Sequence, residues 1–544
     1  MVAFSVPGIG AANAAGSATD LKSIERGYAD FLDAHSATET INSGLMTSVG
    51  GNDGAYWVRE RTLKVTLLTK YFNEISDKRD NSLESRAIAS MRRTFEELTA
   101  AGSDSSAPSA ACGDARSKGQ DAPALQASLY ACFDSPGNQM QFEGQRLTRV
   151  ATLQLLQEIP QADRRKALFM AAHPLWQAIN ANNEIDSPYR RLIASVAPDF
   201  AAGRSPIHTA AATFSVGVPE AERWLVAVLE SWRAVSAAAP GAVVQGIEPW
   251  DYRFNYSLAS RTLATAIGRD ALLPLQQRFY QDLGADPTAL GVVFDLDPRP
   301  GKAPLAYADT IRIGRHIEGR WRPAIVRVSA NDDRGGLGIL NELVHETGHA
   351  VHFMAIRARP AFFWPDITFC EAFADVTSWS VYTPAWQQRY LHTSLPRADG
   401  LREQYAGVML DVAWSLFELR MLRAPDTDPN ALWADITQRY LGIVPHPELS
   451  WWAMRSQLVT DPGYMINYGL GALITAEIRA KTATAIGPID AGNARWYAWI
   501  SANLLRFGGD PDTPQLLRRF LGYSVTPAAL IADIASIGTA PASH

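Results

Sequence analysis

The chain has 544 residues, of which 47% are hydrophobic and 19% are charged, and its formal net charge is −6. A mildly acidic protein without dense runs of Lys and Arg is not expected to bind nucleic acid, and no apolar stretch is long enough to span a bilayer. A chain of this length can bury a large core and ordinarily forms two or more lobes.

The first twenty residues differ from the rest of the chain. Residues 1–20 are small and apolar, contain no Lys or Arg, and include an A-x-A pattern at residues 12–14. This pattern is typical of the end of a secretory signal, although the basic start of such a signal is absent here. We interpret residues 1–20 as a leader or signal-peptide remnant, which predicts a periplasmic or secreted protein. A flexible tail on a cytoplasmic protein is the alternative.

The three cysteines are compatible with this compartment. Cys112 and Cys132 flank a polar stretch and could pair in an oxidising environment, which would leave Cys370 free. Three unpaired thiols are the alternative. Cys370 is interpreted as a core residue in either case.

Residues 21–240 are expected to form an N-terminal helical lobe. Their composition breaks at residues 101–123, which are rich in Ser, Gly, Asp, Ala and Pro and predict a surface loop. Apolar residues at helical spacing predict helices over residues 55–72, 81–100, 146–158 and 220–238.

Residues 241–544 are expected to form a second, catalytic lobe, and the two lobes are expected to form one folding unit. A helix is predicted over residues 401–422, and short β-branched runs predict strands over residues 291–296 and 324–330. The second strand precedes a long apolar run, so it could pair with an extended peptide beside a site. The reading is a mainly α protein with a small sheet.

An H-E-x-x-H motif lies at residues 345–349, inside that apolar, helix-forming run. At 3.6 residues per turn, His345 and His349 stand one above the other on a single helix face. Two imidazoles so placed can bind one Zn²⁺, and Glu346 can hold a water beside it. A chance match is the alternative, so the hypothesis needs a third ligand.

Glu371 is the candidate third ligand. Pro360 and Pro365 must end the first helix, because proline cannot continue its hydrogen-bond ladder, and the chain can then bring Glu371 back against the histidines. Two His and one Glu with a position left for water are typical of catalytic zinc. Asp375, one turn after Glu371, is expected to accept a hydrogen bond from His345. A solvated helix charge is the alternative for Glu371.

Several stretches of the second half resemble the zinc oligopeptidase family of thimet oligopeptidase and oligoendopeptidase F. These stretches are Pro249–Asp251, Asp295–Lys302, His345–His352, the segment around Glu371, Pro462–Tyr468 and the region from Leu504 to Pro514. The match covers roughly residues 248–520, and the first half shows only a helical kinship that is shared with angiotensin-converting enzyme. Glu371 follows His349 by 22 positions, which is slightly fewer than the family usually shows.

The resemblance implies a mainly α, two-lobed helical metallopeptidase fold with a deep central channel and a small β-sheet beside the zinc site. It implies one Zn²⁺ per chain, held by His345, His349 and Glu371 at the floor of the channel. Such a channel admits short unstructured peptides and excludes folded proteins. The implied function is therefore a gluzincin-type zinc metallopeptidase that hydrolyses short peptides; the oligomeric state is left open.

The resemblance also suggests roles for residues around the metal. Glu346 is expected to act as general base and then general acid. Tyr464 and Tyr468, at i and i+4, are expected to project from one helix face into the cleft, with Tyr468 as the main donor to the oxyanion and Tyr464 as the second. Half-buried packing is the alternative for both tyrosines. The family places a histidine shortly before them, where this chain offers Gln457, which can donate a hydrogen bond but carries no charge.

For several other residues the sequence supports two interpretations. Arg299 and Lys302 could bind a peptide carboxylate, but a salt-bridged or solvated face is favoured. His352 is either a channel wall or a core histidine. Gln457 motivates an alternative function, a zinc hydrolase of a non-peptide amide. A helical binding protein that retains zinc without turnover is a further alternative, against which the presence of Glu346 argues.

Overall fold

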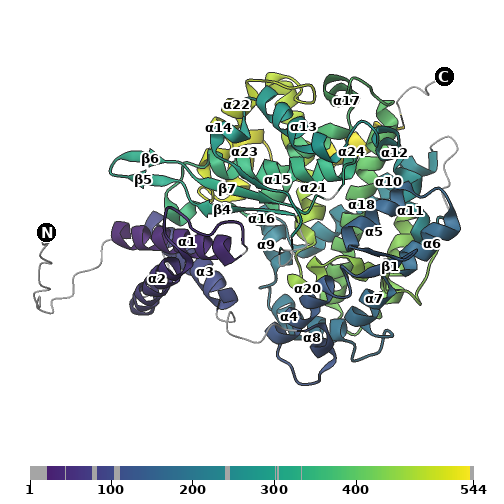
Figure 1. Cartoon of the computed structure of the whole chain (residues 1–544), viewed down its shortest axis with the longest axis horizontal. Helices are drawn as coiled ribbons and strands as arrows, with labels where there is room; N and C mark the ends of the chain where they lie inside the picture. Colours follow the sequence, from purple (N-terminus) through teal and green to yellow (C-terminus); the bar gives the residue numbers. More distant parts are fainter. Residues whose placement is uncertain are drawn as a thin grey trace, which may run out of the picture.

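The computed structural model describes residues 21–42, 44–75, 82–102, 111–238, 246–299, 302, 306–332 and 334–538. Over these residues the chain is mainly α-helical with small sheets, which confirms the predicted fold class (Figure 1). Residues 1–20, the predicted leader, lie outside the described residues. Among the helices of the described part, none is both long and apolar enough to cross a bilayer.

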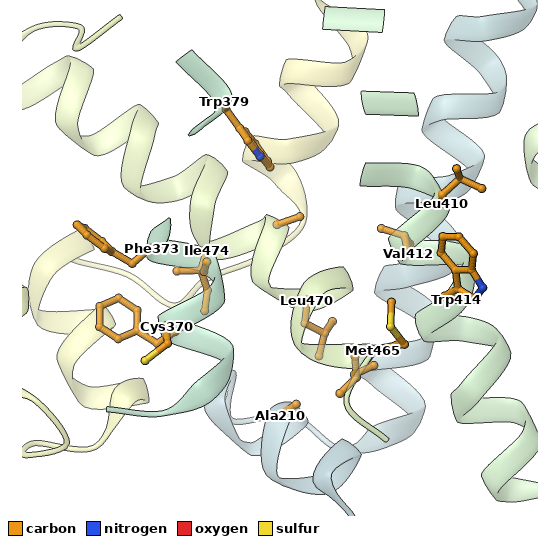
Figure 2. Packing of buried hydrophobic residues seen from close by; sticks show 14 of the residues in the cluster. Ala210, Cys370, Phe373, Trp379, Leu410, Val412, Trp414, Met465, Leu470 and Ile474 are labelled. Atoms are coloured by element: carbon orange, nitrogen blue, oxygen red, sulfur yellow. The ribbon is translucent and has the colours of Figure 1, made fainter. Parts of the chain in front are cut away.

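Four packed helices form the centre of the molecule. They are α15 (Leu337–Ala355), α16 (Ile367–Ser378), α18 (Arg397–Arg423) and α21 (Ile466–Ile486). Helix α16 packs between α15 and α21, and α21 also packs against α18. Figure 2 shows apolar side chains of α16, α18 and α21 packed together, among them Phe373, Val412 and Ile474, all of which are buried. Because full burial of a large apolar side chain contributes about 1.5–3 kcal/mol, this contact holds the helices at fixed spacing.

A three-stranded sheet leads into α15. In spatial order its strands are β3 (Val293–Asp295), β7 (Ile325–Ser329) and β4 (Tyr307–Arg312). Strand β7 pairs parallel to β3 and antiparallel to β4, and the sheet packs against α15, which confirms a small sheet beside the motif helix. The predicted strands 291–296 and 324–330 correspond to β3 and β7. However, β7 is the central strand, so both of its edges are occupied and the expected pairing of this strand with a peptide is wrong.

The remaining elements surround this centre. The helices before the sheet are α1 (Leu21–Asn42), α2 (Gly54–Glu74), α3 (Leu83–Gly102), α4 (Ala122–Asp134), α5 (Arg149–Glu158), α6 (Ala162–Met170), α7 (His173–Asn180), α8 (Pro188–Ala201), α9 (Pro206–Thr213), α10 (Val218–Ala238), α11 (Pro249–Tyr256), α12 (Leu258–Leu263), α13 (Arg269–Asp282) and α14 (Pro287–Leu290). Those after α16 are α17 (Pro384–Leu391), α19 (Pro429–Ile436), α20 (Gln457–Thr460), α22 (Trp496–Asn503), α23 (Thr513–Leu521) and α24 (Ala528–Ala535). Two hairpins are β1 (Met140–Phe142) with β2 (Gln145–Leu147), and β5 (Arg315–Ile317) with β6 (Arg320–Arg322). Short helical turns are η1 (Cys112–Arg116), η2 (Pro360–Phe362), η3 (Trp379–Tyr382), η4 (Thr437–Leu441), η5 (Trp451–Met454) and η6 (Leu505–Phe507).

Helical periodicity located the long helices better than their ends. The predicted helices 55–72, 81–100, 220–238 and 401–422 correspond to α2, α3, α10 and α18, although Asn81 lies outside the described residues. The predicted helix 146–158 begins late, because residues 145–147 form β2 and the Thr148 side chain caps α5 by accepting a hydrogen bond from the Ala151 amide at 3.1 Å. Of the predicted loop 101–123, the described part contains the end of α3, η1 and the start of α4.

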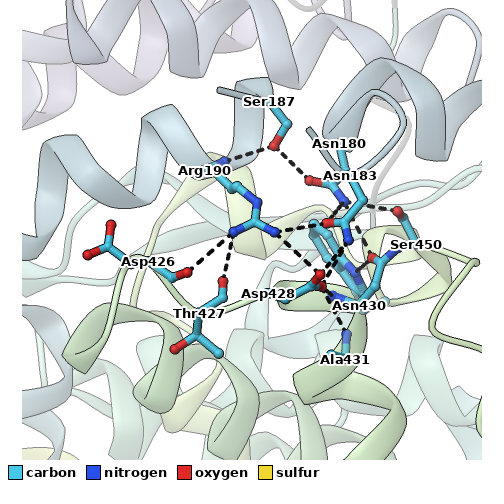
Figure 3. Close-up of polar contacts among 11 residues, drawn as sticks. Asn180, Asn183, Ser187, Arg190, Asp426, Thr427, Asp428, Asn430, Ala431 and Ser450 are labelled. Carbon is cyan, nitrogen blue, oxygen red and sulfur yellow. Dashed lines mark hydrogen bonds and ion pairs between the residues drawn. The ribbon is translucent and has the colours of Figure 1, made fainter. Parts of the chain in front are cut away.

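Contacts between the two halves of the chain are both apolar and polar. One contiguous cluster of buried apolar residues includes members from both predicted lobes. Figure 3 shows a polar network in which the Asn183 amide donates to both oxygens of Asp428, at 2.8 and 2.9 Å, while Arg190 donates to the Thr427 carbonyl at 3.1 Å. In the same network Asn180 donates to Ser450 Oγ at 3.0 Å. The predicted division at residues 240/241 falls in residues 239–245, outside the described residues.

The cysteine pairing that the sequence left open is present in the structure. A disulfide joins Cys112 of η1 to Cys132 of α4. Cys370 is a free, buried thiol, as expected for a core residue.

Candidate active site

The motif residues lie on two neighbouring helices. Helix α15 carries His345, Glu346 and His349 and ends at Ala355, before Pro360. Helix α16 begins after Asp366, whose carboxylate accepts a hydrogen bond from the Phe369 amide at 3.1 Å and so caps the helix that carries Glu371. The turn between these helices therefore places the carboxylate against the histidine pair.

The three candidate ligands converge. Oε2 of Glu371 lies 3.5 Å from Nε2 of His345 and 3.8 Å from Nε2 of His349, and one ligand atom from each residue lies within 4.8 Å of the others. Ligand atoms held about 2.0–2.2 Å from one tetrahedral ion are roughly 3.3–3.5 Å apart, so the spacing suits a metal. Oε2 of Glu371 is buried and accepts no hydrogen bond from the described residues. These residues therefore form a possible His–His–Glu metal site, into which an ion of the zinc type fits.

The hydrogen bonds around the ligands orient them. Nδ1 of His345 lies 2.7 Å from Oδ1 of Asp375, which leaves Nε2 pointing toward Glu371. The hydroxyl of Tyr464 donates to Oε1 of Glu371 at 2.5 Å, which leaves Oε2 of that carboxylate toward the histidines. Asp375 thus sets which nitrogen of His345 faces an ion, and Tyr464 sets which oxygen of Glu371 does so.

Burial and neighbouring charges shift the pKa values of these groups. Burial raises the pKa of Glu346 to about 8, although His345 opposes the shift. Burial lowers the pKa of His349 to about 4, so this ring is neutral at pH 7, the form that binds a metal. For Glu371, burial alone would raise the pKa, but His345, His349 and the Tyr464 hydroxyl bring it to about 2. Burial would lower the pKa of His345, but Asp375 and Glu371 raise it well above its usual value.

A close contact sets the spacing of the two helices. Gly348 lies in the turn between the two motif histidines, and a Cβ built on it would be 2.8 Å from Cα and 2.9 Å from the carbonyl oxygen of Ala374. Real Cβ atoms do not approach backbone so closely, so α16 can reach α15 here only because residue 348 has no side chain. The approach brings Glu371 to the histidines.

The site opens into a cavity of about 430 Å³. His345, Glu346, Asp375, Gln457 and Tyr468 all line it. Glu346 is buried, yet its carboxyl group forms no hydrogen bond or ion pair with a residue that the structure describes, so it can exchange a proton with a molecule in the cavity. The volume falls within the range of roughly 300–1,000 Å³ that is common for small-molecule sites.

The two tyrosines lie differently from the expectation. Tyr464 precedes α21, in the turn that follows Gly463, and only Tyr468 lies in the first turn of the helix. Gly463 has a φ of 97° and belongs to that turn, and α21 begins only at Ile466, so Tyr464 lies outside the helix and the expected shared helix face is wrong. The rings still lie 5.6 Å apart, and burial raises the pKa of Tyr468 well above its usual value, so its hydroxyl remains a donor.

Three of the ambiguous residues lie away from this chemistry. Lys302 is buried and donates to Asp295 Oδ1 at 3.2 Å and to the Asp295 carbonyl at 2.7 Å, and Arg299 pairs with the same carboxylate at 2.6 Å. The structure therefore supports the prediction that Lys302 and Arg299 form salt bridges. His352 is fully buried against Phe369 and Phe373, so it is a core residue and no part of the cavity wall.

Sequence reasoning missed three arginines of the cavity wall, Arg149, Arg253 and Arg455. They come from the start of α5, from α11 and from the segment after η5, so only the fold brings them together. Arg455 pairs with Asp411 of α18 at 2.8 Å and lies over the Tyr468 ring, 4.9 Å from its centre. A weak signal existed, because Arg253 follows the Pro249–Asp251 stretch that carries the family resemblance, and Arg455 is two residues before Gln457, where the chain departs from the family.

The comparisons with known proteins find similarity in structure only. Neither the models of protein families nor the curated proteins match the sequence. An M32 carboxypeptidase from Deinococcus radiodurans R1 has a TM-score of 0.53 and 13% identity, covering 95% of this chain and 99% of that chain. PZ peptidase A, solved with an inhibitor, has a TM-score of 0.55 and 14% identity, covering 96% and 97%. A Bacillus anthracis str. Ames protein assigned as an oligoendopeptidase F has a TM-score of 0.53 and 15% identity, covering 96% of each chain.

The chain has the fold of these peptidases. The similarity agrees with the resemblance to oligoendopeptidase F that the sequence motifs indicated. The structural similarity also covers more of the chain than the sequence motifs do, because it extends over nearly the whole chain and so includes the first half.

Proposed function

We propose that this protein is a zinc-dependent metallopeptidase that hydrolyses short peptides, with Glu346 as the general base. The observation that carries the proposal is the convergence of His345, His349 and Glu371 on one point at the wall of a cavity, with an unpaired Glu346 beside them. The fold, shared with a carboxypeptidase and an oligoendopeptidase F, supports the same reaction class.

Each residue of the site has a distinct task in this proposal. Zn²⁺ held by the three ligands would polarise the scissile carbonyl and lower the pKa of a water to about 7. Glu346 takes the proton of the attacking water and then delivers it to the leaving amine. The hydroxyl of Tyr468 donates a hydrogen bond to the oxyanion that develops on the carbonyl, and the Gln457 amide is a second donor in the same wall. Tyr464 serves the metal ligand Glu371, to which it already donates.

The size of the cavity and the disulfide support the finer parts of the proposal. A cavity of about 430 Å³ suits a few residues of an extended peptide better than a folded protein. The Cys112–Cys132 disulfide favours an oxidising compartment, so we place the protein in the periplasm or outside the cell.

A Glu346→Gln variant tests the mechanism. Glutamine keeps the shape of the side chain but cannot accept the proton, so the variant should bind about one zinc per chain and lose hydrolysis of a quenched peptide library of graded length. His349→Ala is the matched control, because it should lose the metal and the activity together. Unchanged cleavage by Glu346→Gln would remove this residue from the mechanism.

A second candidate is a zinc hydrolase of a non-peptide amide. Gln457 favours it, since a neutral amide stands in the wall where a charged histidine is expected for peptide turnover. The library separates the two candidates, because a non-peptide hydrolase would leave peptides of every length intact while a small aryl amide is cleaved with zinc and spared with chelator.

A further inference from the structure

Two of the three arginines in the wall of the cavity have no carboxylate partner among the residues that the structure describes. The third, Arg455, is paired with Asp411 at 2.8 Å. Among the described residues, the Arg149 guanidinium donates only one long hydrogen bond, 3.4 Å, to the Met454 carbonyl. Arg253 forms no hydrogen bond or ion pair with any residue in the described ranges, although it lines the cavity.

Arginines with a structural role in this chain are arranged differently. Arg165 is buried and donates twice to Asp251, at 2.6 and 2.8 Å. Arg327 is buried and donates twice to Asp309, at 2.6 and 2.9 Å. An enclosed guanidinium without a carboxylate is costly, and at these two positions the fold supplies the carboxylate. Arg149 and Arg253, by contrast, line a cavity and have no such partner among the described contacts.

The carboxylates of the wall do not supply the missing partners. Asp375 is engaged with His345 at 2.7 Å, and Glu403 accepts hydrogen bonds from the backbone and hydroxyl of Ser260. Asp411 forms an ion pair with Arg455. Glu342 and Glu346 remain, but neither forms an ion pair with Arg149 or Arg253 among the described contacts, and burial raises the pKa of both carboxyl groups.

The two arginines keep their charge at neutral pH. Burial and the nearby Arg455 lower the pKa of Arg149 to about 10, and burial lowers the pKa of Arg253. Both remain protonated at pH 7, and their charges repel one another across the cavity. An anion placed between them removes this repulsion and restores the partners that the fold leaves out.

We propose that Arg149 and Arg253 form a subsite that binds a carboxylate of the substrate. A planar guanidinium matches a carboxylate in shape and can donate two parallel hydrogen bonds to it. The subsite lines the same cavity as His345 and Glu346, so a short peptide can reach both. The inference rests on the proposed peptidase function, and it names the substrate class: peptides that present a carboxylate, either the C-terminal one or that of an Asp or Glu side chain.

Equilibrium binding tests the subsite without relying on turnover. The zinc-loaded Glu346→Gln protein is titrated with three versions of one hexapeptide: the free acid with an internal Glu, its C-terminal amide, and the free acid with Gln in place of that Glu. Binding is followed by tryptophan fluorescence, since Trp379 and Trp414 line the cavity. The carboxylate that the subsite holds is the one whose removal weakens binding, by about 10-fold or more.

Variants assign that preference to the arginines. Arg149→Gln and Arg253→Gln, combined on the Glu346→Gln background, should remove the difference between the peptides, while Arg253→Lys should retain part of it because the charge remains. Arg439→Gln is the matched control, since Arg439 is largely exposed and lies outside the cavity wall. Circular dichroism and zinc content check that the fold and the metal site are intact.

Four results are decisive. Equal affinity for all three peptides overturns the inference without any arginine variant, as does a preference that survives in the double arginine variant. Cleavage by the unmodified enzyme without such a preference leaves the proposed function standing and removes the subsite. A carboxylate preference that the double arginine variant loses, in a protein that cleaves no peptide, keeps the subsite and removes the peptidase.

Discussion

Oδ1 of Asp375 lies 2.7 Å from Nδ1 of His345, on the side of the ring opposite to the candidate metal position. The contact engages Nδ1 and leaves Nε2 as the ring nitrogen that faces an ion. Asp375→Ala should therefore weaken zinc binding by about 10–100-fold while leaving all three ligands in place. Competition with a chelator of known affinity measures the change. Affinity equal to that of the unmodified protein would show that packing alone orients His345.

The hydroxyl of Tyr468 lines the cavity and has no hydrogen bond among the described contacts. If it stabilises the oxyanion, Tyr468→Phe should lower kcat by about 10²–10³-fold while KM and zinc content change little. Steady-state kinetics on a cleaved library peptide give the two constants separately. A rise in KM with kcat unchanged would assign the ring to substrate packing.

We expect a different result for a variant of Tyr464, because its hydroxyl donates a hydrogen bond to Glu371 at 2.5 Å. Tyr464→Phe removes that bond and leaves Oε1 of the carboxylate without its donor, so zinc affinity should fall along with kcat. Excess zinc should restore part of the activity of Tyr464→Phe and none of that of Tyr468→Phe. Identical responses of the two variants would contradict the separation of their roles.

The Cys112–Cys132 disulfide closes a loop of residues 20 positions apart. Closing a loop of about this length removes chain entropy from the unfolded state and is typically worth about 3 kcal/mol. Replacing both cysteines, or adding reductant, should lower the Tm of the unmodified protein by several degrees. Reductant should have no effect on the double variant, and Cys370→Ala should keep the sensitivity to reductant.

Glu418 of α18 gives a pH dependence to stability. It is fully buried, and although burial is opposed by the backbone amides of Gly463 and Met465, its pKa is raised to about 8. Between its usual pKa near 4.5 and about 8, the folded state holds a proton that the unfolded state has released, so stability falls as pH rises through this window.

Glu418→Gln removes that contribution. The variant should show a flatter Tm between pH 5 and pH 8 than the unmodified protein and should be the more stable of the two at pH 8. The difference grows by at most about 1.4 kcal/mol per pH unit. Thermal unfolding at a constant scan rate measures it, with exposed Glu230→Gln as the control. Parallel pH profiles for Glu418→Gln and the unmodified protein would show that Glu418 titrates normally.

The sequence predicted the parts of the site that depend on local spacing. His345, His349 and Asp375 occupy helix faces that their intervals along the chain already define, and a proline between two helical runs indicated the turn that brings Glu371 back. The class of fold followed from helical periodicity in the same way.

Features that depend on tertiary packing were not predictable. Arg149 and Arg253 are more than 100 positions apart and meet only because α5 and α11 pack together. The hairpin of β5 and β6 has no apolar alternation, since three of its six residues are arginines, so periodicity gave no sign of it. Tyr464 was placed on the same helix as Tyr468 because the spacing of the two tyrosines matched a helical period, whereas α21 begins only at Ile466.

The close contact between Gly348 and Ala374 means that one methyl group can disrupt the candidate metal site without altering any of the residues that would act in it. Gly348→Ala would force the two helices apart by tenths of an ångström at the point where three side chains have to meet. A search for related proteins with the same candidate metal site therefore needs to check the residue at the position of Gly348. A chain that keeps all the ligands but has a larger residue at this position has lost the geometry that the site requires.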